Sequence, residues 1–276
     1  MDPRTLLRQR GIRPSKGLGQ NFIVDQAALE KIVAAAELTP GDFVLEIGAG
    51  LGALTERLAR NAGRVVAVEL DERMIGVLRE MLSGLDNVAL VQGDILALDP
   101  TELVRPATRY KVVANLPYYI TSAVLRHLLE ASARPQRMVV TVQREVAERI
   151  VAGPGEMSLL AVSVQFYGQP KLLFHIKSGS FYPSPGVESA VVRVDMHDKL
   201  SVPAEDVDGF FRIVKAGFAQ RRKQLRNTLA AGLRLPSEEV AARLQAVGVD
   251  PKRRAETLSL EEWARVTQAL LPTAPL

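Results

Sequence analysis

Short apolar runs alternate with helical patterns from about residue 26 to residue 151, and this alternation constrains the fold more than any other feature. The runs are Phe43–Ile47, Val65–Val68, Val88–Val91, Lys111–Ala114 and Met138–Gln143. The helical patterns between and around them are Ala27–Glu37, Ala53–Asn61, Glu72–Ser83, Ser122–Ala131 and Glu145–Val151. Continuous apolar strands that are joined through helices are typical of a parallel sheet covered on both faces. The sequence therefore predicts an α/β fold.

The alternation ends near Ser158. Three further runs predict strands without helices between them, so we expect the sheet to end in an antiparallel section; these runs are Leu159–Phe166, Leu172–Ile176 and Ser189–Val194. Beyond Asp198 the patterns are helical only, over Val207–Leu229, Ser237–Val247 and Leu260–Leu270. Pro203 and its polar neighbours fit a linker. We predict an α/β domain over residues 1–198 and a small all-helical domain over residues 199–276.

Composition excludes several kinds of chemistry. The chain has no cysteine, so it has neither a disulfide nor a thiolate nucleophile. Its three histidines do not lie at metal-ligand spacing, and we expect no metal centre. Residues 1–20 are charged and do not resemble a secretory signal, and no apolar run approaches the roughly 20 residues that cross a bilayer. We therefore expect a cytoplasmic protein without a membrane partner, and a monomer.

The net charge of +4 is distributed unevenly. Residues 1–20 carry a net charge of +4, residues 21–200 carry −3, and residues 201–276 carry +3. Between Arg212 and Arg226 there are six basic residues and no acidic one, and the helical pattern places Arg221, Arg222, Lys223 and Arg226 on a helix. Phe210, Phe211, Val214 and Phe218 recur at helical spacing there and are better explained by core packing. Such a charge run is commonly a solvated face, but basic ends on a slightly acidic body favour a polyanion as partner.

A glycine-rich turn follows the first predicted strand of the parallel sheet. Gly48, Gly50 and Gly52 alternate with other residues directly after Phe43–Ile47. Glycines here let backbone amides approach a ligand, although such a turn is often only a tight turn. The G-x-G-x-G spacing differs from the G-x-G-x-x-G of pyrophosphate-binding sites, and this disfavours a nicotinamide dehydrogenase.

Two acidic residues follow the next two strands. Glu69 ends the second strand, 17 residues after Gly52, where a carboxylate can accept both ribose hydroxyls of a nucleoside. Asp94 ends the third strand, where it can accept from an adenine amino group. Either residue alone could be a solvated loop residue, but their joint placement favours one shared site. Without a pyrophosphate-type turn, the best ligand is an adenosine that carries a sulfonium group, S-adenosylmethionine.

Asn115-Leu116-Pro117-Tyr118 ends the fourth strand. An adenine N6 amine is a poor nucleophile because its lone pair is delocalised into the ring. The Asn115 side-chain oxygen and the Leu116 carbonyl can bind both amino hydrogens and favour the pyramidal nitrogen that attacks a methyl group. Pro117 stiffens the loop, and Tyr118 offers a ring for stacking on the base. The alternative is a strand-to-helix turn with a core tyrosine.

These residues together resemble the ribosomal RNA adenine N6,N6-dimethyltransferases. The motifs that carry the resemblance occur in order and extend from about Arg8 to Arg265: Gly19–Asp25, Glu46–Gly52, Glu69, Gly93-Asp94, Asn115–Tyr118, Gln143–Ala147, and Phe181-x-Pro-x-Pro-x-Val-x-Ser189. The resemblance implies a seven-stranded, Rossmann-like class I methyltransferase sheet and a helical RNA-contacting domain. It implies methyl transfer from S-adenosylmethionine to two adjacent adenines near the 3′ end of small-subunit rRNA, during assembly of that subunit.

The resemblance also implies site residues. Those around the cofactor are Asn21, Ile23, Gly48, Glu69, Asp94 and Asn115, to which the glycine spacing adds Gly50. Asn115, Leu116, Pro117 and Tyr118 hold the adenine, and Phe181 stacks on its other face. Pro183 and Pro185 fix an extended loop that could present this phenylalanine, although Phe181 could instead be a buried loop anchor.

Two other functions stay open. A large-subunit rRNA methylase of the macrolide-resistance type shares the fold and the Asn-x-Pro-Tyr motif, but Gly19–Phe22 and Asn115–Tyr118 fit the small-subunit branch better. An assembly or transcription factor could keep the fold without catalysis. The intact Glu69, Asp94 and Asn115–Tyr118 argue against that loss.

Overall fold

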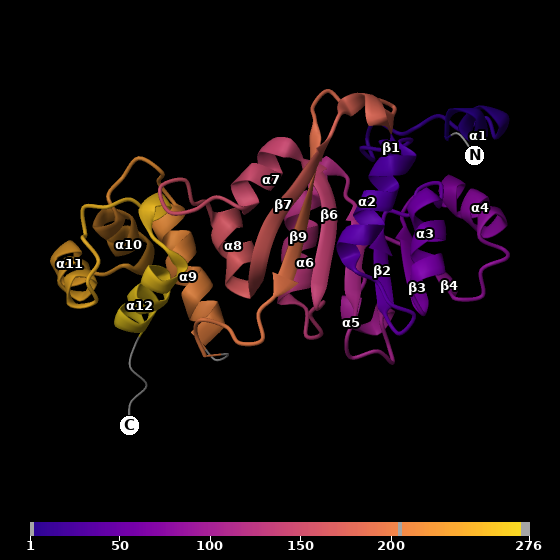
Figure 1. Ribbon diagram of the computed structural model, residues 1–276. Helices are drawn as coiled ribbons and strands as arrows, with labels where there is room; N and C mark the ends of the chain where they lie inside the picture. The colour runs from indigo at the N-terminus through magenta and orange to yellow at the C-terminus, as the bar shows by residue number, and fades with distance from the viewer. Residues whose placement is uncertain (1–2, 204–205, 272–276) are drawn as a thin grey trace. The chain divides into compact units, whose positions relative to one another are not determined.

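Seven strands form one mixed sheet in the computed structural model, which describes residues 3–203 and 206–271 (Figure 1). Their order is β4-β3-β2-β5-β6-β9-β7. The bounds are β2 (Phe43–Ile47), β3 (Arg64–Glu69), β4 (Val88–Gln92), β5 (Lys111–Asn115), β6 (Arg137–Gln143), β7 (Gly168–Ile176) and β9 (Ser189–Met196). Neighbouring strands from β4 to β6 are parallel, and β9 runs antiparallel to β6. The predicted seven-stranded α/β sheet with an antiparallel end is confirmed.

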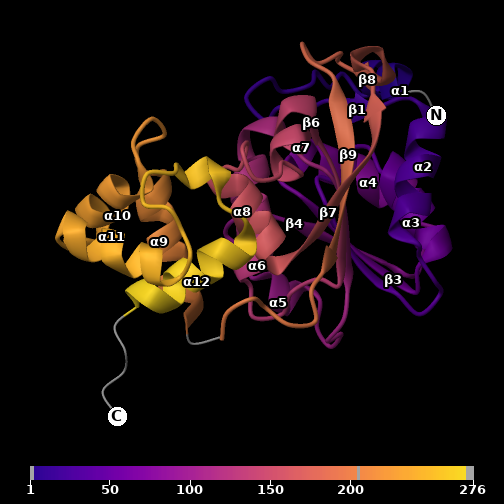
Figure 2. The same cartoon turned by 60° about the vertical axis from the view of Figure 1, so that its left-hand side comes forward.

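Both faces of the inner parallel strands are buried, which explains their continuous apolar sequences, whereas the edge strand β4 is only partly buried. Val44 and Leu45, whose side chains point to opposite faces, are both fully buried. On one face, α2 (Gln26–Ala36) and α3 (Ala53–Asn61) form a core with Val44, Val65 and Val113. Helix α6 (Thr121–Glu130) lies on the opposite face of the sheet (Figures 1 and 2). The remaining connections contain α4 (Glu72–Met81), α5 (Pro100–Leu103), η1 (Tyr118–Ile120) and α7 (Arg144–Ile150).

A two-stranded sheet joins the start of the chain to a segment near residue 180. Strand β1 (Phe22–Ile23) pairs antiparallel with β8 (Phe181–Tyr182), which follows η2 (Ser178–Ser180). Before β1, the short helix α1 (Pro3–Gln9) buries Leu6 and Leu7 in a cluster that includes Met74 and Leu78 of α4. The N-terminal residues are therefore anchored on the larger unit of the fold.

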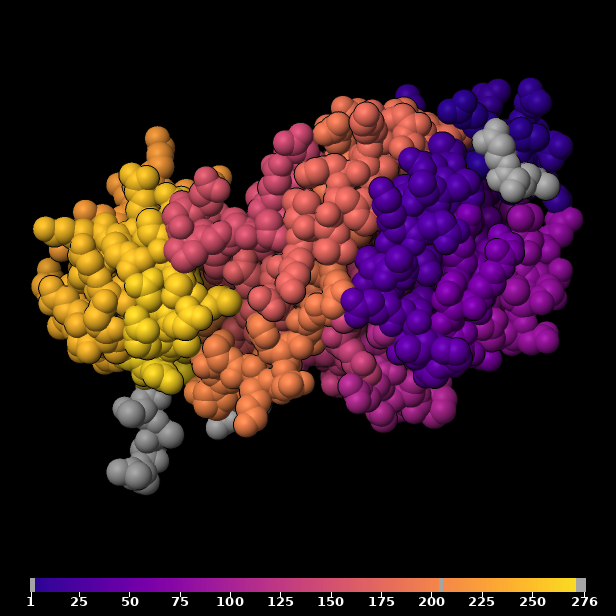
Figure 3. All heavy atoms as spheres, viewed as in Figure 1, coloured from indigo at the N-terminus to yellow at the C-terminus, as the bar shows by residue number. Residues whose placement is uncertain are grey.

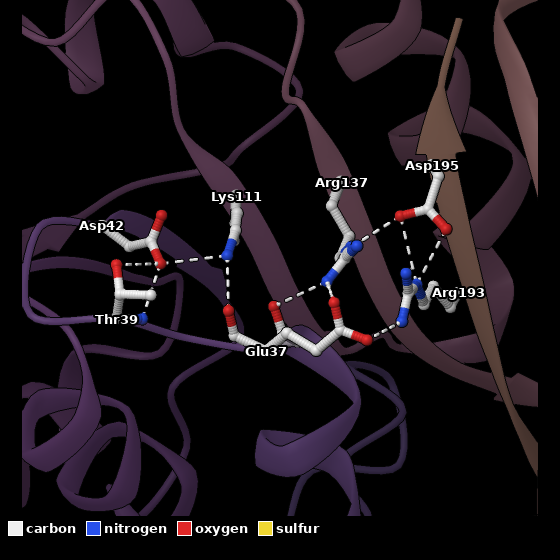
Figure 4. Close-up of polar contacts among 8 residues, drawn as sticks. Glu37, Thr39, Asp42, Lys111, Arg137, Arg193 and Asp195 are labelled. Carbon is white, nitrogen blue, oxygen red and sulfur yellow. Dashed lines mark hydrogen bonds and ion pairs between the residues drawn. The ribbon is translucent and has the colours of Figure 1, made fainter.

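An ion-pair cluster closes the edge of the sheet at the amino ends of β5 and β6 (Figure 4). Arg137 donates to Glu37 (2.6 Å) and to Asp195 (2.6 Å), and Arg193 donates to the same two carboxylates (2.5 and 2.8 Å). The cluster joins Glu37, the residue after α2, to β6 and β9. It therefore lies at the opposite edge of the sheet from the glycine-rich turn, which follows the carboxyl end of β2.

The chain divides into two compact units. The first consists of Met1–Ala147 and Pro170–Met196, and the second consists of Glu148–Gln169 and His197–Leu276. The second unit contains α8 (Leu159–Tyr167), α9 (Val207–Phe218), α10 (Leu225–Leu233), α11 (Ser237–Ala246), η4 (Ala255–Thr257) and α12 (Leu260–Leu270). Its core includes the fully buried Trp263, whose ring lies so close to Gly217 that a Cβ there would approach within 2.4 Å. The predicted division at residues 198 and 199 stays a prediction, and these units assign residues 148–169 to the helical part.

Two predicted elements are wrong. Leu159–Phe166 is not a strand but most of α8, which begins where the Ser158 hydroxyl accepts from the Ala161 amide (3.2 Å). A short apolar run has no periodicity that separates a buried strand from a buried helix.

Val207–Leu229 is not one helix either. It breaks after Phe218 and resumes at Leu225. The amide of Leu225 donates to the Arg253 carbonyl (2.7 Å), which satisfies a backbone donor at the start of α10. Arg221, Arg222 and Lys223 therefore lie in the connection between helices, and only Arg226 is helical.

Candidate active site

An open cavity lies at the carboxyl ends of β2, β3, β4 and β5. The space inside it that admits water is about 80 Å³, and the cavity is open to solvent. The predicted site residues in its wall are Asn21, Gly48, Gly50, Glu69, Asp94, Asn115, Leu116, Pro117 and Tyr118. The structure thus brings together residues from the N-terminal segment and from the ends of four strands.

The glycine-rich turn after β2 forms the floor of this cavity. Gly48 and Gly50 have φ values of +76° and +58°, which only glycine adopts readily. A Cβ on Gly50 would also approach the Phe22 ring to 3.0 Å. The turn therefore needs glycine for its conformation and for the close passage of the N-terminal segment.

Glu69 points its carboxylate at this turn. One carboxylate oxygen accepts from the Gly50 amide (2.8 Å) and the other from the Asp71 amide (2.9 Å). Burial raises the pKa of Glu69, and the backbone hydrogen bonds oppose that rise. Each oxygen keeps a second lone pair, so the ionised side chain can accept two hydroxyls.

Asp94 is exposed at the end of the segment after β4. Its Oδ1 accepts from the Leu96 amide (2.9 Å), which fixes the side chain at the cavity wall. Glu69 and Asp94 line the same cavity, and the prediction that they hold one ligand stays a prediction.

Asn115 ends β5 and connects the strand to the N-terminal segment. Its Nδ2 donates to the Asn21 carbonyl (2.9 Å). This bond leaves the side-chain oxygen as the acceptor end of the amide. The Leu116 amide donates to the Thr141 carbonyl of β6 (3.2 Å), so the loop after β5 is held by the neighbouring strand.

Tyr118 is held at its hydroxyl. The Tyr118 oxygen lies 2.6 Å from the Ser189 hydroxyl, and Ser189 is fully buried at the start of β9. Burial raises the pKa of Tyr118, so the phenol stays protonated at neutral pH. The ring is therefore fixed at both ends, by the backbone of η1 and by β9.

Two predicted site residues lie elsewhere. Phe181 is 1% exposed and packs in the core cluster of α2 and α3, so the prediction that it stacks on a base is wrong for this conformation. Pairing of β8 with β1 turns the ring inward. Ile23, opposite Phe181 in that pair, is also buried and lines a small neighbouring cavity with Glu46 and Asn115.

Hydrogen bonds that the sequence does not predict connect the N-terminal segment to the residues after β3. Gln20 Oε1 accepts from the Ser15 amide (2.7 Å), and its Nε2 donates to Asp71 (2.8 Å). Asp71 in turn accepts from the Arg73 guanidinium. Gln20 lies inside a motif that sequence reasoning recognised, but nothing in the sequence identified Asp71 as its partner.

Other kinds of site are not found in the part of the chain that the structure describes. No group of acidic and histidine residues there could hold a metal ion. No helix there is long and apolar enough to cross a membrane.

Comparison with known protein families identifies the family to which the chain belongs. The profile of the ribosomal RNA adenine dimethylases matches residues 13–271. The chain belongs to the ribosomal RNA adenine dimethylase family. The ribosomal RNA small subunit methyltransferase A of Dehalococcoides mccartyi strain CBDB1 is 49% identical over 92% of the chain and 88% of that relative. The protein of that name from Pelotomaculum thermopropionicum is 45% identical over 97% and 95%.

Solved structures support the family fold. The 23S rRNA methyltransferase ErmE superposes with a TM-score of 0.73 and 28% identity, over 90% of this chain and 99% of ErmE. A dimethyladenosine transferase from Plasmodium falciparum gives a TM-score of 0.76 over 89% and 95%, and its 22% identity speaks for the fold alone. Both solved structures therefore share the fold of this chain.

Proposed function

We propose that this family member transfers methyl groups from S-adenosylmethionine to the N6 amines of two adjacent adenines near the 3′ end of small-subunit rRNA. The observation that carries the proposal is the meeting of Glu69, Asp94 and the Asn115–Tyr118 loop at one cavity. The relatives at 45–49% identity, named as small-subunit methyltransferases, favour this substrate over large-subunit rRNA. We propose the cytoplasm as its location, where such a subunit is assembled, and a monomer as its state.

The residues present fit S-adenosylmethionine. Glu69 can accept the two ribose hydroxyls, and Asp94 can accept from the adenine amine. The turn at Gly48 and Gly50 has no side chain to block a close approach, and Asn21 and Asn115 border the same space. When bound, the cofactor supplies an electrophilic methyl group on a sulfonium centre.

The loop after β5 then acts on the acceptor adenine. The Asn115 side-chain oxygen and the Leu116 carbonyl accept the two N6 hydrogens, which concentrates the nitrogen lone pair toward the donor. Tyr118 stacks on the base. Methyl transfer yields a cationic amine that loses its proton readily, so no strong general base is needed, and catalysis rests on positioning and electrostatics.

The test uses purified full-length protein, labelled cofactor and unmodified small ribosomal subunits. Mass spectrometry of the rRNA should find dimethyladenine at two adjacent positions near the 3′ end. Dimethyladenine only in large-subunit RNA would select the resistance-type function, and none in either RNA would favour an assembly factor without catalysis.

Asn115→Ala separates the acceptor site from the fold. It should abolish transfer, a loss of at least 100-fold in rate, because one of two acceptors for the N6 hydrogens disappears. Thermal unfolding should stay close to that of the unchanged protein. Asn61→Ala, an exposed helix residue, is the matched control and should keep full activity. Full activity in the Asn115 variant would contradict the acceptor-site assignment.

A further inference from the structure

A second, basic cleft lies beside the active-site cavity. Arg4 and Arg8 of α1, Arg13 of the following segment and Tyr182 of β8 line it. All three arginines are exposed, and the residues of α1 lie at the surface at the upper right of Figure 3. The described lining carries no carboxylate. The cleft therefore gathers positive charge on the described part of its wall.

The arginines of this segment differ in their partners. Arg10 points away and forms an ion pair with Glu80 of α4. The Arg4 guanidinium lies over the Tyr182 ring, 5.5 Å from its centre, which orients it along the cleft. Arg8 and Arg13 form no ion pair with any residue that the structure describes. These two charges are thus available to an anion from solution.

The cleft adjoins the cavity through one pair of strands. Tyr182 is directly opposite Phe22 in the pairing of β8 with β1, and Phe22 lines the active-site cavity. Opposed residues in an antiparallel pair have Cα atoms about 5 Å apart. The connecting segment is fastened as well, since the Arg13 carbonyl accepts from Arg73 (3.2 Å) and Gln20 bonds Ser15 and Asp71. The arginines are therefore held at a defined place relative to the acceptor site.

We propose that this cleft binds phosphate groups of the RNA strand next to the adenine that enters the cavity. The inference rests on the proposed function, because a strand that delivers an adenine must continue past the cavity rim. Guanidinium groups bind phosphate oxygens in a bidentate manner, and an aromatic ring beside them suits a neighbouring base. The cleft is separate from the loop at Arg221, Arg222 and Lys223, which belongs to the other compact unit.

The decisive variant is full-length Arg8→Glu/Arg13→Glu. Its matched control is Arg64→Glu/Arg109→Glu, which reverses two exposed arginines, one at the start of β3 and one before β5, at the opposite edge of the sheet. Methylation of unmodified small subunits is measured across substrate concentrations and from 50 to 200 mM salt. S-adenosylmethionine affinity is measured by calorimetry and the fold by thermal unfolding.

For the cleft variant we expect KM for the subunit to rise at least about 10-fold, with kcat and cofactor affinity unchanged. The slope of log affinity against log salt should fall in magnitude by about 0.7–0.9 for each lost phosphate contact. Arg8→Lys/Arg13→Lys should raise KM less than the glutamate variant does, because the charge remains although the bidentate geometry is lost. An unchanged KM and salt slope would overturn the proposal, as would an equal loss in the control or a loss of cofactor affinity. If the unchanged protein fails to methylate small subunits, the proposed function itself has failed, which is a distinguishable result.

Discussion

Glu46 is the most unusual residue beneath the active site. It is 1% exposed, and neither carboxylate oxygen has a hydrogen-bond partner among the described residues. Burial raises the pKa of Glu46 to about 8; the nearby Thr55 hydroxyl opposes the rise without reaching hydrogen-bonding geometry, and the Glu69 charge adds to it. The folded protein thus holds a proton that the unfolded chain, with a carboxyl pKa near 4.5, releases. Stability is therefore lost as pH rises from about 4.5 through 8.

Glu46→Gln tests this linkage. The amide cannot ionise, so without cofactor the variant should gain stability over the unchanged protein as pH rises from 6 to 9. The gain in Tm at pH 9 should be at least about 2–4 °C, the shift that corresponds to 1 kcal/mol in a domain of this size. Thermal unfolding across that pH range measures it. Glu56→Gln, a half-buried residue of α3 that pairs with Arg60, should show no such pH dependence. A Tm difference that is equal at pH 6 and pH 9 would contradict the buried proton.

The bond between Tyr118 and Ser189 suggests a second residue-scale prediction. Ser189→Ala and Tyr118→Phe each remove the bond but leave an aromatic ring, so each should lower kcat/KM for the RNA substrate about 3- to 10-fold. The double variant should be no worse than either single one, because both remove the same interaction. Steady-state methylation kinetics measure the cycle, and Ser184→Ala in the neighbouring exposed loop is the control. Additive losses would show that the bond is not the shared cause.

The residues that meet at the cavity could be predicted from the sequence because they follow strands. The carboxyl ends of parallel strands meet at one edge, which places Glu69, Asp94 and Asn115 together once the strands are recognised. The position of the Phe181 ring could not be predicted in this way, because Phe181 does not follow a strand of the parallel sheet. It precedes a proline-rich loop, and only the pairing of β8 with β1 shows which way its ring turns. The partners of Gln20 and Tyr118 depend on tertiary contacts that no local pattern encodes.

At the scale of elements, the cluster around Glu37 joins α2 to β6 and β9. Hydrogen bonds from Arg137 and Arg193 lower the pKa of Glu37 to about 2. Its contribution to stability is therefore present above the unfolded value near 4.5 and is lost as pH falls through about 2.

Glu37→Gln should consequently lower Tm at pH 7, and the difference from the unchanged protein should shrink as pH falls from 4.5 toward 2. Thermal unfolding at several pH values is the measurement. Glu30→Gln, an exposed residue of α2 paired with Arg57, should give a smaller difference at pH 7. A difference that persists at pH 2 would mean that the charge of Glu37 does not matter.

Most elements were predictable, and the two errors have physical causes. The parallel strands and their helices have either continuous apolar runs or a clear helical period. The run Leu159–Phe166 is ambiguous because its two polar residues, Ser163 and Gln165, are two positions apart, as on one face of a strand, although the run folds into α8. The break between α9 and α10 depends on the turn at Pro251–Arg253, which lies far along the chain and accepts the first amides of α10.

At the scale of the whole molecule, the uneven distribution of charge along the sequence leaves exposed basic residues on the folded protein. Arg221, Arg222 and Lys223 are exposed in the connection between α9 and α10. None of them forms an ion pair within the described residues, so their charges are available to RNA phosphates. Arg226 is half-buried on α10 and is less suited to this role.

Reversing these three charges to glutamate should therefore weaken binding of the RNA substrate at least about 10-fold and lower its salt dependence. S-adenosylmethionine affinity should be unchanged, since the cofactor cavity belongs to the other compact unit. Binding isotherms at 50 and 200 mM salt measure both effects, with Arg64→Glu/Arg109→Glu as control. RNA affinity equal to that of the unchanged protein would remove this loop from the substrate interface.

The position of β9 has a consequence for biosynthesis. Although β9 is the last strand of the sheet to be translated, it lies between β6 and β7. Until residues 189–196 leave the ribosome, β6 therefore has an exposed edge, and Tyr118 lacks the hydroxyl of Ser189. A nascent chain can bring the glycine turn and Glu69 together early, but it completes its acceptor pocket late. An rRNA-modifying enzyme built in this way becomes active only after most of its own translation is finished.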